Sequence, residues 1–433
     1  MKRNAYQNLL DWKNSSRRKP LIIKGARQVG KTWLIYNFAE NEYENHIYIS
    51  FKDNPEAIDI FSGIMDTKVL LERITIISGE KITAGKTLII FDEIQDYPNA
   101  VSSLKFFNEN ANENHIISAG SLLGTYLAKQ TSFPVGKVNI LNMYPFTFDE
   151  FLYEVDETMY QYYKKVKGLH DYLPALHERM LDLYCKYLII GGMPECVKSW
   201  SENKDPAEIL SIQKELVTIY EHDFSKYNSK IPAEKILHLF RNIIPQLAKE
   251  KGEKFSYKGL KPGARGKDYQ GAIEWLITSG LVLKVDNVTA PRYPLNAYNQ
   301  SSVFKLFLLD VGLTKYMAGL VNESIILDGD FSFKGQLNEN FVLQQLAPQL
   351  TFLPNYYSFD RDKEINFIIQ NKSGDIVPIE VKSGKNKRAT SFKSYIANYH
   401  PQTAIRLSSN GYVKDGMITN IPLYFASKLM ELI

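Results

Sequence analysis

Short apolar runs alternate with polar or amphipathic segments over the first third of the chain. Most are spaced widely enough to leave room for a helix between them. A strand buried on both faces of a parallel sheet shows as a continuous apolar run. The pattern therefore predicts an α/β nucleotide-binding domain over residues 1–151. The runs lie at 21–23, 46–49, 88–91, 115–117 and 138–141.

The apolar positions take up helical spacing after about residue 145. Residues three and four apart lie on one face of a helix, so this spacing predicts an all-helical lid over 152–229. The spacing is clearest at Met180, Leu183, Tyr184, Tyr187 and Leu188.

Residues 230–320 show two or three short helices before two further apolar runs. These runs, 281–283 and 304–309, flank a loop rich in proline and asparagine. Helices followed by a two-stranded wing are typical of a winged helix-turn-helix. We expect its last helix at 266–279.

Composition limits the classes of function. The 433 residues carry 52 Lys and Arg against 48 Asp and Glu, a net charge of +4, so any nucleic-acid site must be a local patch. Two cysteines, Cys185 and Cys196, cannot form a disulfide framework or a complete zinc site. No apolar stretch approaches the ~18 residues of a membrane span. We expect a cytoplasmic protein without membrane contacts.

A glycine-rich motif directly follows the first predicted strand. It matches G-x-x-x-x-G-K-[ST], and an amphipathic segment follows it, as a phosphate-binding loop requires. Its amides would point at phosphate oxygens at the start of a helix. Lys31 would bridge the β- and γ-phosphates of ATP, and Thr32 would place its hydroxyl on Mg²⁺. The candidate nucleotide-binding residues are Gly25, Ala26, Arg27, Gln28, Val29, Gly30, Lys31, Thr32 and Trp33.

Two adjacent carboxylates end the apolar run at 88–91. Asp92 would join the magnesium shell with Thr32, while Glu93 would polarise the attacking water as general base. A carboxylate directly after the magnesium-binding Asp favours hydrolysis over simple binding. The catalytic candidates are therefore Glu93 and Lys31.

These motifs, together with several others, resemble those of the prokaryotic AAA+ family ATPases that carry a C-terminal domain of unknown function. The resemblance covers nearly the whole chain. It implies a parallel P-loop sheet, a helical lid, a winged helix and a C-terminal nuclease-like module. The further landmarks are Gly120-Ser121, Pro145-Phe146-x-Phe148-x-Glu150-Phe151, Gly191-Gly192-Met193-Pro194-Glu195, Leu309-Asp310-Val311-Gly312-Leu313 and Glu339-Asn340-Phe341-Val342.

The resemblance also marks departures from the family pattern. The family usually has a hydroxyl that senses the γ-phosphate where this chain has Ala119, and either Ser118 or Ser121 is the expected substitute. Lys137 stands where the family has arginine, and is either a weaker charge stabiliser or an exposed lysine before a strand. Pro194 either contacts the adenine, as in related signalling ATPases, or only forms a helix-terminating turn.

The last predicted domain, 321–433, contains a hairpin of 364–370 with 376–383. Alternation places Glu380 and Lys382 on one face of a strand. With Glu339 and Asn366 they resemble the core of PD-(D/E)xK nucleases. That resemblance implies a metal site, in which Asn366 replaces a charged ligand and the nearby Asp360 and Asp362 could compensate. We expect an inactive relic of the nuclease fold. An active nuclease and a coincidental hairpin remain alternatives, and Asn366→Asp is the change expected to restore metal affinity.

A basic and aromatic cluster falls within the predicted winged helix. It suits nucleic-acid phosphates, or else it is a solvated loop of a domain that relays motion. The main expectation is an ATPase that couples nucleotide state to a C-terminal module. The alternatives are a slow nucleotide switch, and an ATP-dependent DNA-binding protein or nuclease; a protein partner or homo-oligomer fits each of them. The cluster comprises Tyr257, Lys258, Lys261, Arg265, Lys267 and Tyr269.

Overall fold

The computed structural model describes residues 1–52, 54–63, 65–120, 134, 136–226, 231–249, 255–326, 332–360, 363–382 and 390–433. The chain forms two compact units. The first comprises Met1–Tyr144 with Thr278–Gly280, and the second comprises Pro145–Ile277 with Leu281–Ile433. The sequence places the end of the first domain at residue 151. No helix among the described residues combines the length and the hydropathy needed to cross a membrane.

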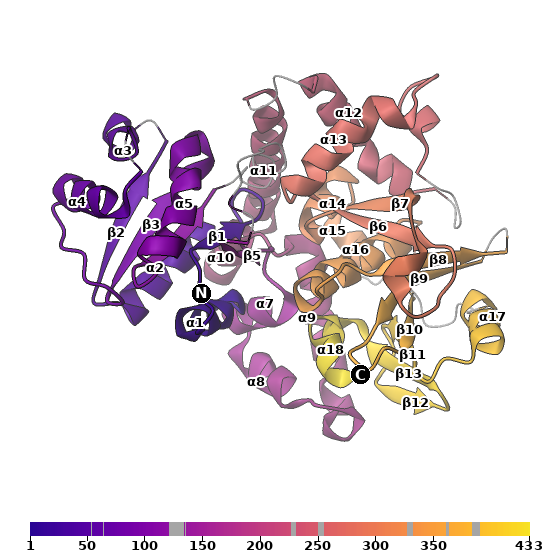
Figure 1. Cartoon of the computed structure of the whole chain (residues 1–433). Coiled ribbons are helices and arrows are strands. Elements are labelled where there is room, and N and C mark those ends of the chain that lie inside the picture. The colour runs from indigo at the N-terminus through magenta and orange to yellow at the C-terminus, as the bar shows by residue number, and fades with distance from the viewer. Residues whose placement is uncertain are drawn as a thin grey trace. The chain divides into compact units, whose positions relative to one another are not determined.

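The first unit is built on a five-stranded parallel sheet (Figure 1). Its order is β2-β3-β4-β1-β5, so β4 lies between the strand before the phosphate loop and the strand that ends in Asp92. This confirms the predicted parallel P-loop sheet. The strands are β1 (Leu21–Lys24), β2 (Asn45–Ser50), β3 (Thr87–Asp92), β4 (His115–Ala119) and β5 (Asn139–Asn142).

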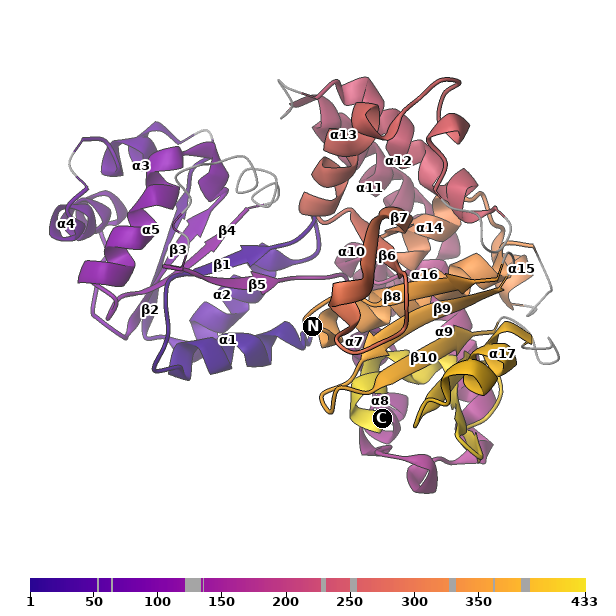
Figure 2. The same ribbon diagram turned by 45° about the vertical axis from the view of Figure 1, so that its right-hand side comes forward.

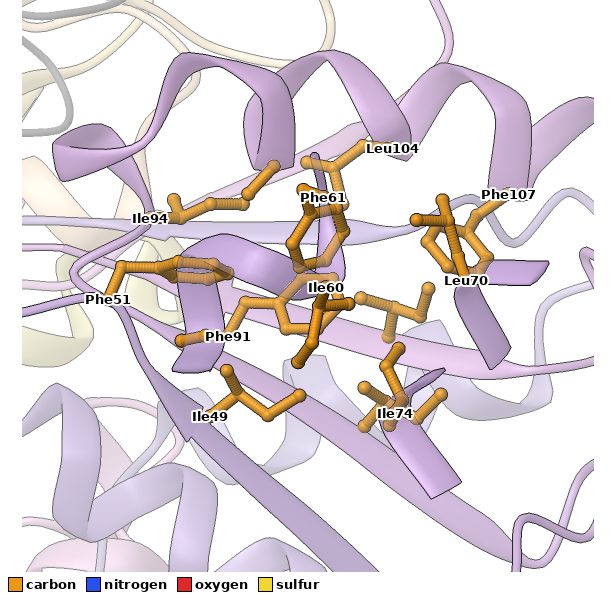
Figure 3. Packing of buried hydrophobic residues seen from close by; sticks show 14 of the residues in the cluster. Ile49, Phe51, Ile60, Phe61, Leu70, Ile74, Phe91, Ile94, Leu104 and Phe107 are labelled. Carbon is orange, nitrogen blue, oxygen red and sulfur yellow. The ribbon is translucent and has the colours of Figure 1, made fainter. Parts of the chain in front are cut away.

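Helices cover both faces of this sheet. Parallel strands are joined by right-handed crossovers, and the chain reverses its direction across the sheet at β2, so α2 covers one face and α4 and α5 the other (Figure 2). On the second face, Ile49, Phe51 and Phe91 pack against helical residues such as Leu70 and Leu104 (Figure 3). The helices are α1 (Ala5–Asn14), α2 (Lys31–Glu42), α3 (Pro55–Ile60), α4 (Thr67–Ser78) and α5 (Pro98–Asn110).

The second unit opens with helices, as the change to helical spacing predicts. All five apolar residues that showed this spacing are buried along α9. The helices of this unit are α7 (Phe148–Val155), α8 (Glu157–Lys165), α9 (His177–Ile190), α10 (Pro194–Asn203), α11 (Pro206–Lys226), α12 (Ala233–Leu247), α13 (Gly266–Thr278), α14 (Val311–Met317), α15 (Asn322–Ile326), α16 (Lys334–Leu346), α17 (Thr390–Tyr399) and α18 (Leu429–Leu432).

A mixed eight-stranded sheet follows, in the order β12-β13-β11-β10-β9-β8-β6-β7. The antiparallel β6–β7 hairpin occupies the place of the predicted wing, and β6 pairs with β8 at Asn287 and Tyr356. The expected wing and the expected nuclease-like hairpin are therefore parts of one sheet. The strands are β6 (Val282–Val288), β7 (Asn299–Leu308), β8 (Asn355–Phe359), β9 (Lys363–Gln370), β10 (Ile376–Val381), β11 (Ala404–Ser408), β12 (Val413–Asp415) and β13 (Ile418–Pro422).

The predicted hairpin around residues 371–375 is confirmed. Strands β9 and β10 are antiparallel, with Ile376 opposite Gln370 and Ile379 opposite Phe367. Continued by one pair, this register sets Glu380 level with Asn366 on the same face of the sheet. Strand β11 then pairs with β10 in parallel, after the crossover through α17.

Three of the landmark motifs meet in a buried polar junction of the second unit. The carboxylate of Asp310 accepts hydrogen bonds from the Gly192 amide (2.6 Å) and from Gln344 Nε2 (3.0 Å). A Cβ atom at Gly192 would lie 2.2 Å from the Phe146 carbonyl oxygen, so only glycine fits there. Burial raises the pKa of Asp310, although its hydrogen bonds act in the opposite direction. These motif residues therefore have a structural role, because they contact one another in the buried core of the second unit.

Candidate functional site

The phosphate loop connects β1 to α2 and depends on two glycines. Gly25 has φ +155°, and a Cβ atom there would lie 2.3 Å from the Met143 carbonyl oxygen. Gly30 has φ +89° and is the N-cap of α2. Both conformations favour glycine, and they let the loop close tightly before the helix begins. Between them, Ala26 and Val29 are buried, while Gln28 is exposed at φ +64°.

Lys31 lies inside this loop. Its ammonium group donates to the Gly25 carbonyl (2.9 Å) and to the Ala26 carbonyl (2.7 Å). Burial lowers the pKa of Lys31 to about 8; the nearby Glu93 and Asp92 act to raise it and Arg27 to lower it. The lysine is therefore mostly cationic at neutral pH, and its ammonium group lies against the backbone of the loop. The next two side chains, Thr32 and Trp33, are exposed.

Arg3, which lies outside the motif, holds the phosphate loop through a hydrogen bond. Arg3 is buried, and its guanidinium donates to the carbonyls of Val29 (2.8 Å) and Tyr144 (2.6 Å). Sequence reasoning missed Arg3, because an arginine in a polar N-terminal stretch carries no local signal for a partner 26 or 141 residues away.

The two predicted carboxylates stand at the carboxyl end of β3. Thr32 Oγ1 lies 3.5 Å from Asp92 Oδ2, so the two candidate magnesium ligands face each other. Tyr48, on β2, donates its hydroxyl to the same oxygen at 2.6 Å. Burial and this hydrogen bond raise the pKa of Tyr48, so the phenol stays protonated. Tyr48 was not predicted; its outward position on a buried strand was the only available signal.

Glu93 adopts an unusual backbone conformation. Its φ is +49°, a left-handed value that costs free energy for a residue with a side chain. Gln95 Nε2 donates to Glu93 Oε2 at 2.5 Å. Gln95 is buried and thus fixes one oxygen of the expected general base. Sequence reasoning had given Gln95 no role at the site.

This edge of the sheet has the chemistry that a magnesium nucleotide requires. Loop amides and Lys31 suit the phosphates, and the exposed Thr32 hydroxyl beside the Asp92 carboxylate offers the oxygen donors that Mg²⁺ prefers. The donor set therefore fits the expected ion. The roles of these residues in binding and catalysis stay predictions.

The other predicted contacts of the nucleotide are placed differently. Ser118 is fully buried, level with Ile22 and Phe91 of the apolar core, and its Oγ has no hydrogen-bond partner among the described residues. The alternative substitute, Ser121, lies outside the described residues. Pro194 follows the turn that ends α9 and is the first residue of α10, a position that favours proline; its contact with adenine stays a prediction.

Lys137 lies just before β5 and forms a 2.8 Å ion pair with Glu109 of α5. This pairing lowers the pKa of Glu109. Because β5 runs parallel to β1, Lys137 is at the amino edge of the sheet and the phosphate loop is at the carboxyl edge. Within one chain, Lys137 is therefore an ion-paired lysine remote from the loop.

The candidate nuclease-like residues make direct contacts in the second unit. Asn366 Nδ2 donates to Glu339 Oε1 at 2.6 Å, and Asn366 Oδ1 accepts from the Val381 amide at 2.9 Å. Glu380 is fully buried, with Lys382 Nζ 2.5 Å from its Oε1. Asp360 is exposed and paired with Lys363, so it does not join them, and Asp362 lies outside the described residues.

Three family models match separate parts of the chain. Residues 17–152 match the AAA domain. Residues 181–324 match a domain of unknown function (DUF8612), and residues 334–425 match another (DUF4143). A search of curated proteins gives no significant match.

Several solved structures are distantly similar. They include the Aeropyrum pernix ORC1 protein in complex with DNA, which is 13% identical over 72% of this chain and 90% of that chain, with a TM-score of 0.29. The Thermotoga maritima RuvB Holliday junction branch migration motor is 14% identical over 68% and 90%, with a TM-score of 0.28. The S. cerevisiae Hsp104–ADP complex is 13% identical over 63% and 38%, with a TM-score of 0.29. TM-scores this low do not establish a shared overall fold. The family match, the glycine loop and the strand order together identify residues 17–152 as an AAA domain with a P-loop fold.

Proposed function

We propose that this chain binds ATP with Mg²⁺ and hydrolyses it, and that the nucleotide state controls the second unit as an effector or binding module. The observation that carries the proposal is Lys31, a buried cation inside a closed loop, across from Asp92 and Glu93 at the same edge of the sheet. A structural lysine would not require this loop or the two carboxylates.

Each residue has a distinct task in this proposal. Loop amides and Lys31 bind the β- and γ-phosphates, while Thr32 and Asp92 would hold Mg²⁺, which neutralises phosphate charge. Glu93 takes a proton from the attacking water, and Gln95 keeps its carboxylate oriented through one oxygen.

Two variants test the assignment. Lys31→Ala should abolish or severely weaken ATP binding in calorimetry, because no other motif residue offers a mobile cation to the phosphates. Glu93→Gln should keep ATP bound but slow hydrolysis by about 100-fold or more. Lys86→Ala is the matched control, because Lys86 is an exposed lysine of the same unit, paired with Glu44. Unchanged affinity in the first variant, or normal turnover in the second, contradicts the proposal.

A slow nucleotide switch is the second form of this function. Ala119 offers no hydroxyl, and Lys137 is paired with Glu109 at the far edge of the sheet. Fewer groups that stabilise the transferred charge should mean slow turnover. Single-turnover hydrolysis compared with the rate of nucleotide release distinguishes a switch from a motor. A switch hydrolyses its bound ATP slowly and does not respond to added DNA.

DNA binding through the second unit is supported by four exposed basic residues. Lys258, Lys261, Arg265 and Lys267 lie before and at the start of α13. The expected aromatic contribution needs correction, because Tyr269 is only 5% exposed and packs against His238. The Tyr269 ring packs against α12, so the half-buried Tyr257 is the remaining aromatic candidate for contact with a base.

The salt dependence of DNA binding tests this candidate. If the four basic residues contact phosphates, neutralising Lys258, Lys261 and Arg265 together should lower the slope of log K against log salt by about 2–3. Lys186→Ala, which removes a partly exposed lysine paired with Asp182, should leave the slope unchanged. An equal slope in the triple variant would assign this segment to a solvated loop.

A further inference from the structure

Three glutamates lie close to Asn366 in the second unit. Glu364 and Asn366 are on β9 and Glu380 is on β10, on the same face of the sheet, and Glu339 reaches this face from α16. Glu364 is 2% exposed and Glu380 is fully buried. Carboxylates this deeply buried need cations or donors close by to remain charged.

Lysine ammonium groups supply these cations. Lys305 reaches in from β7, and its Nζ lies 2.5 Å from Glu364 Oε1 and 3.7 Å from Glu339 Oε2. It also lies 5.1 Å from the centre of the Tyr356 ring. Burial alone would lower the pKa of Lys305, but Glu364 and Glu339 outweigh burial and raise it, so the ammonium stays charged. A second ammonium group, Lys382 Nζ, lies 2.5 Å from Glu380 Oε1.

The pocket does not fit the divalent metal that a nuclease-like core implies. A hard cation needs several oxygen ligands turned toward one point. Instead, the amide nitrogen of Asn366 donates to Glu339, and its oxygen is used by the Val381 amide. No group of three histidine, cysteine, aspartate or glutamate side chains in the described parts of the chain is placed to hold a metal ion.

We propose that the ammonium group of Lys305 is the resident cation of this carboxylate cluster and takes the place of a divalent metal. Strand β7 of the predicted wing supplies this positive charge to Glu364 on β9 and Glu339 on α16. The charge balance of the nuclease-like core therefore depends on the wing. The module then has no metal-activated water with which to cleave a phosphodiester bond. This inference does not rest on ATP hydrolysis by the first unit.

Manganese binding to the nucleotide-free full chain tests the proposal, with Asp92→Asn in every variant to remove the other candidate ion site. Electron paramagnetic resonance should show no bound Mn²⁺ in the Asp92→Asn variant. It should also show none when Asn366→Asp is the only further substitution. Adding Lys305→Met with Asn366→Asp should produce one Mn²⁺ site, because a cavity of about 90 Å³ lined by Lys305, Glu339 and Glu364 gives the ion space. Mn²⁺ bound while Lys305 is present, or no binding once it is removed, overturns the proposal.

A double-mutant cycle tests the ion pair without any metal. Lys305→Met leaves Glu364 buried and unpaired, and should lower the melting temperature by about 10 °C. Adding Glu364→Gln removes the stranded charge and should restore most of the loss, even if the single variant folds poorly. Lys363→Met is the control, since Lys363 lies on the same strand as Glu364 and pairs with the exposed Asp360 rather than with the cluster. A double variant no more stable than Lys305→Met contradicts the assignment.

Discussion

Nucleotide affinity should fall as the pH rises above about 8, because Lys31 then loses its proton in the nucleotide-free protein. Bound phosphates favour the charged lysine, so binding takes up one proton above that pH. The nucleotide affinity therefore has its full value below the pKa of Lys31 in the nucleotide-free protein, and it declines above that pKa. Affinity should fall by a factor of about 10 at pH 9 and about 30 at pH 9.5.

Calorimetric titration with ADP and Mg²⁺ from pH 7.5 to 9.5 measures the effect. The phosphates are fully ionised above pH 8, so the ligand itself does not titrate. Two buffers with different protonation enthalpies should report uptake of about one proton per nucleotide at pH 9. An affinity independent of pH would refute the reasoning. It would mean that the carbonyls of Gly25 and Ala26 stabilise the ammonium enough to offset its burial.

Three further outcomes are expected from local geometry. Gly25→Ala should abolish nucleotide binding in the same titration, since its Cβ would lie 2.3 Å from the Met143 carbonyl oxygen. Gly192→Ala should lower the free energy of unfolding in urea by about 1–3 kcal/mol, because its Cβ would meet the Phe146 carbonyl oxygen at 2.2 Å. Burial is the main reason that the pKa of His115 falls to about 4, so stability is retained above pH 6.5 and lost as the pH drops toward 4. Acidification from pH 6.5 to 5 should therefore destabilise the first unit by up to about 2 kcal/mol, and His115→Gln should remove this dependence.

The parts of the site that sequence predicted are local in the chain. A glycine loop between a strand and a helix is encoded within about ten residues, so its fold follows once those neighbours form. The carboxylates after β3 were also predictable, because they directly follow an apolar run in the sequence. Parallel strands present their carboxyl ends at one edge of the sheet, which brings these carboxylates to the side of the phosphate loop. The helical spacing along α9 was equally local, and all five residues that showed it are buried.

The groups that sequence could not predict act across long separations. Arg3 reaches the phosphate loop and the end of the sheet from the N-terminal segment. Tyr48 meets Asp92 only because β2 and β3 are neighbours in the sheet. Periodicity indicates which face of a strand a residue occupies, but it does not reveal which distant side chain will complete a buried charge.

Lys305 shows how the missing information changes an interpretation of function. Sequence treats the segment around it as a wing and treats Glu364 as part of a separate module, so no pattern relates the two. In the structure, β6 pairs with β8, so the predicted wing and the predicted module belong to one sheet. The ammonium group of Lys305 on β7 also balances the charge of Glu364 on β9. The neutral Asn366 alone suggests a lost metal ligand that one substitution could restore. With Lys305 in place, the cluster already has its cation, and restoring Asp at that position would add a fourth carboxylate without making room for a metal.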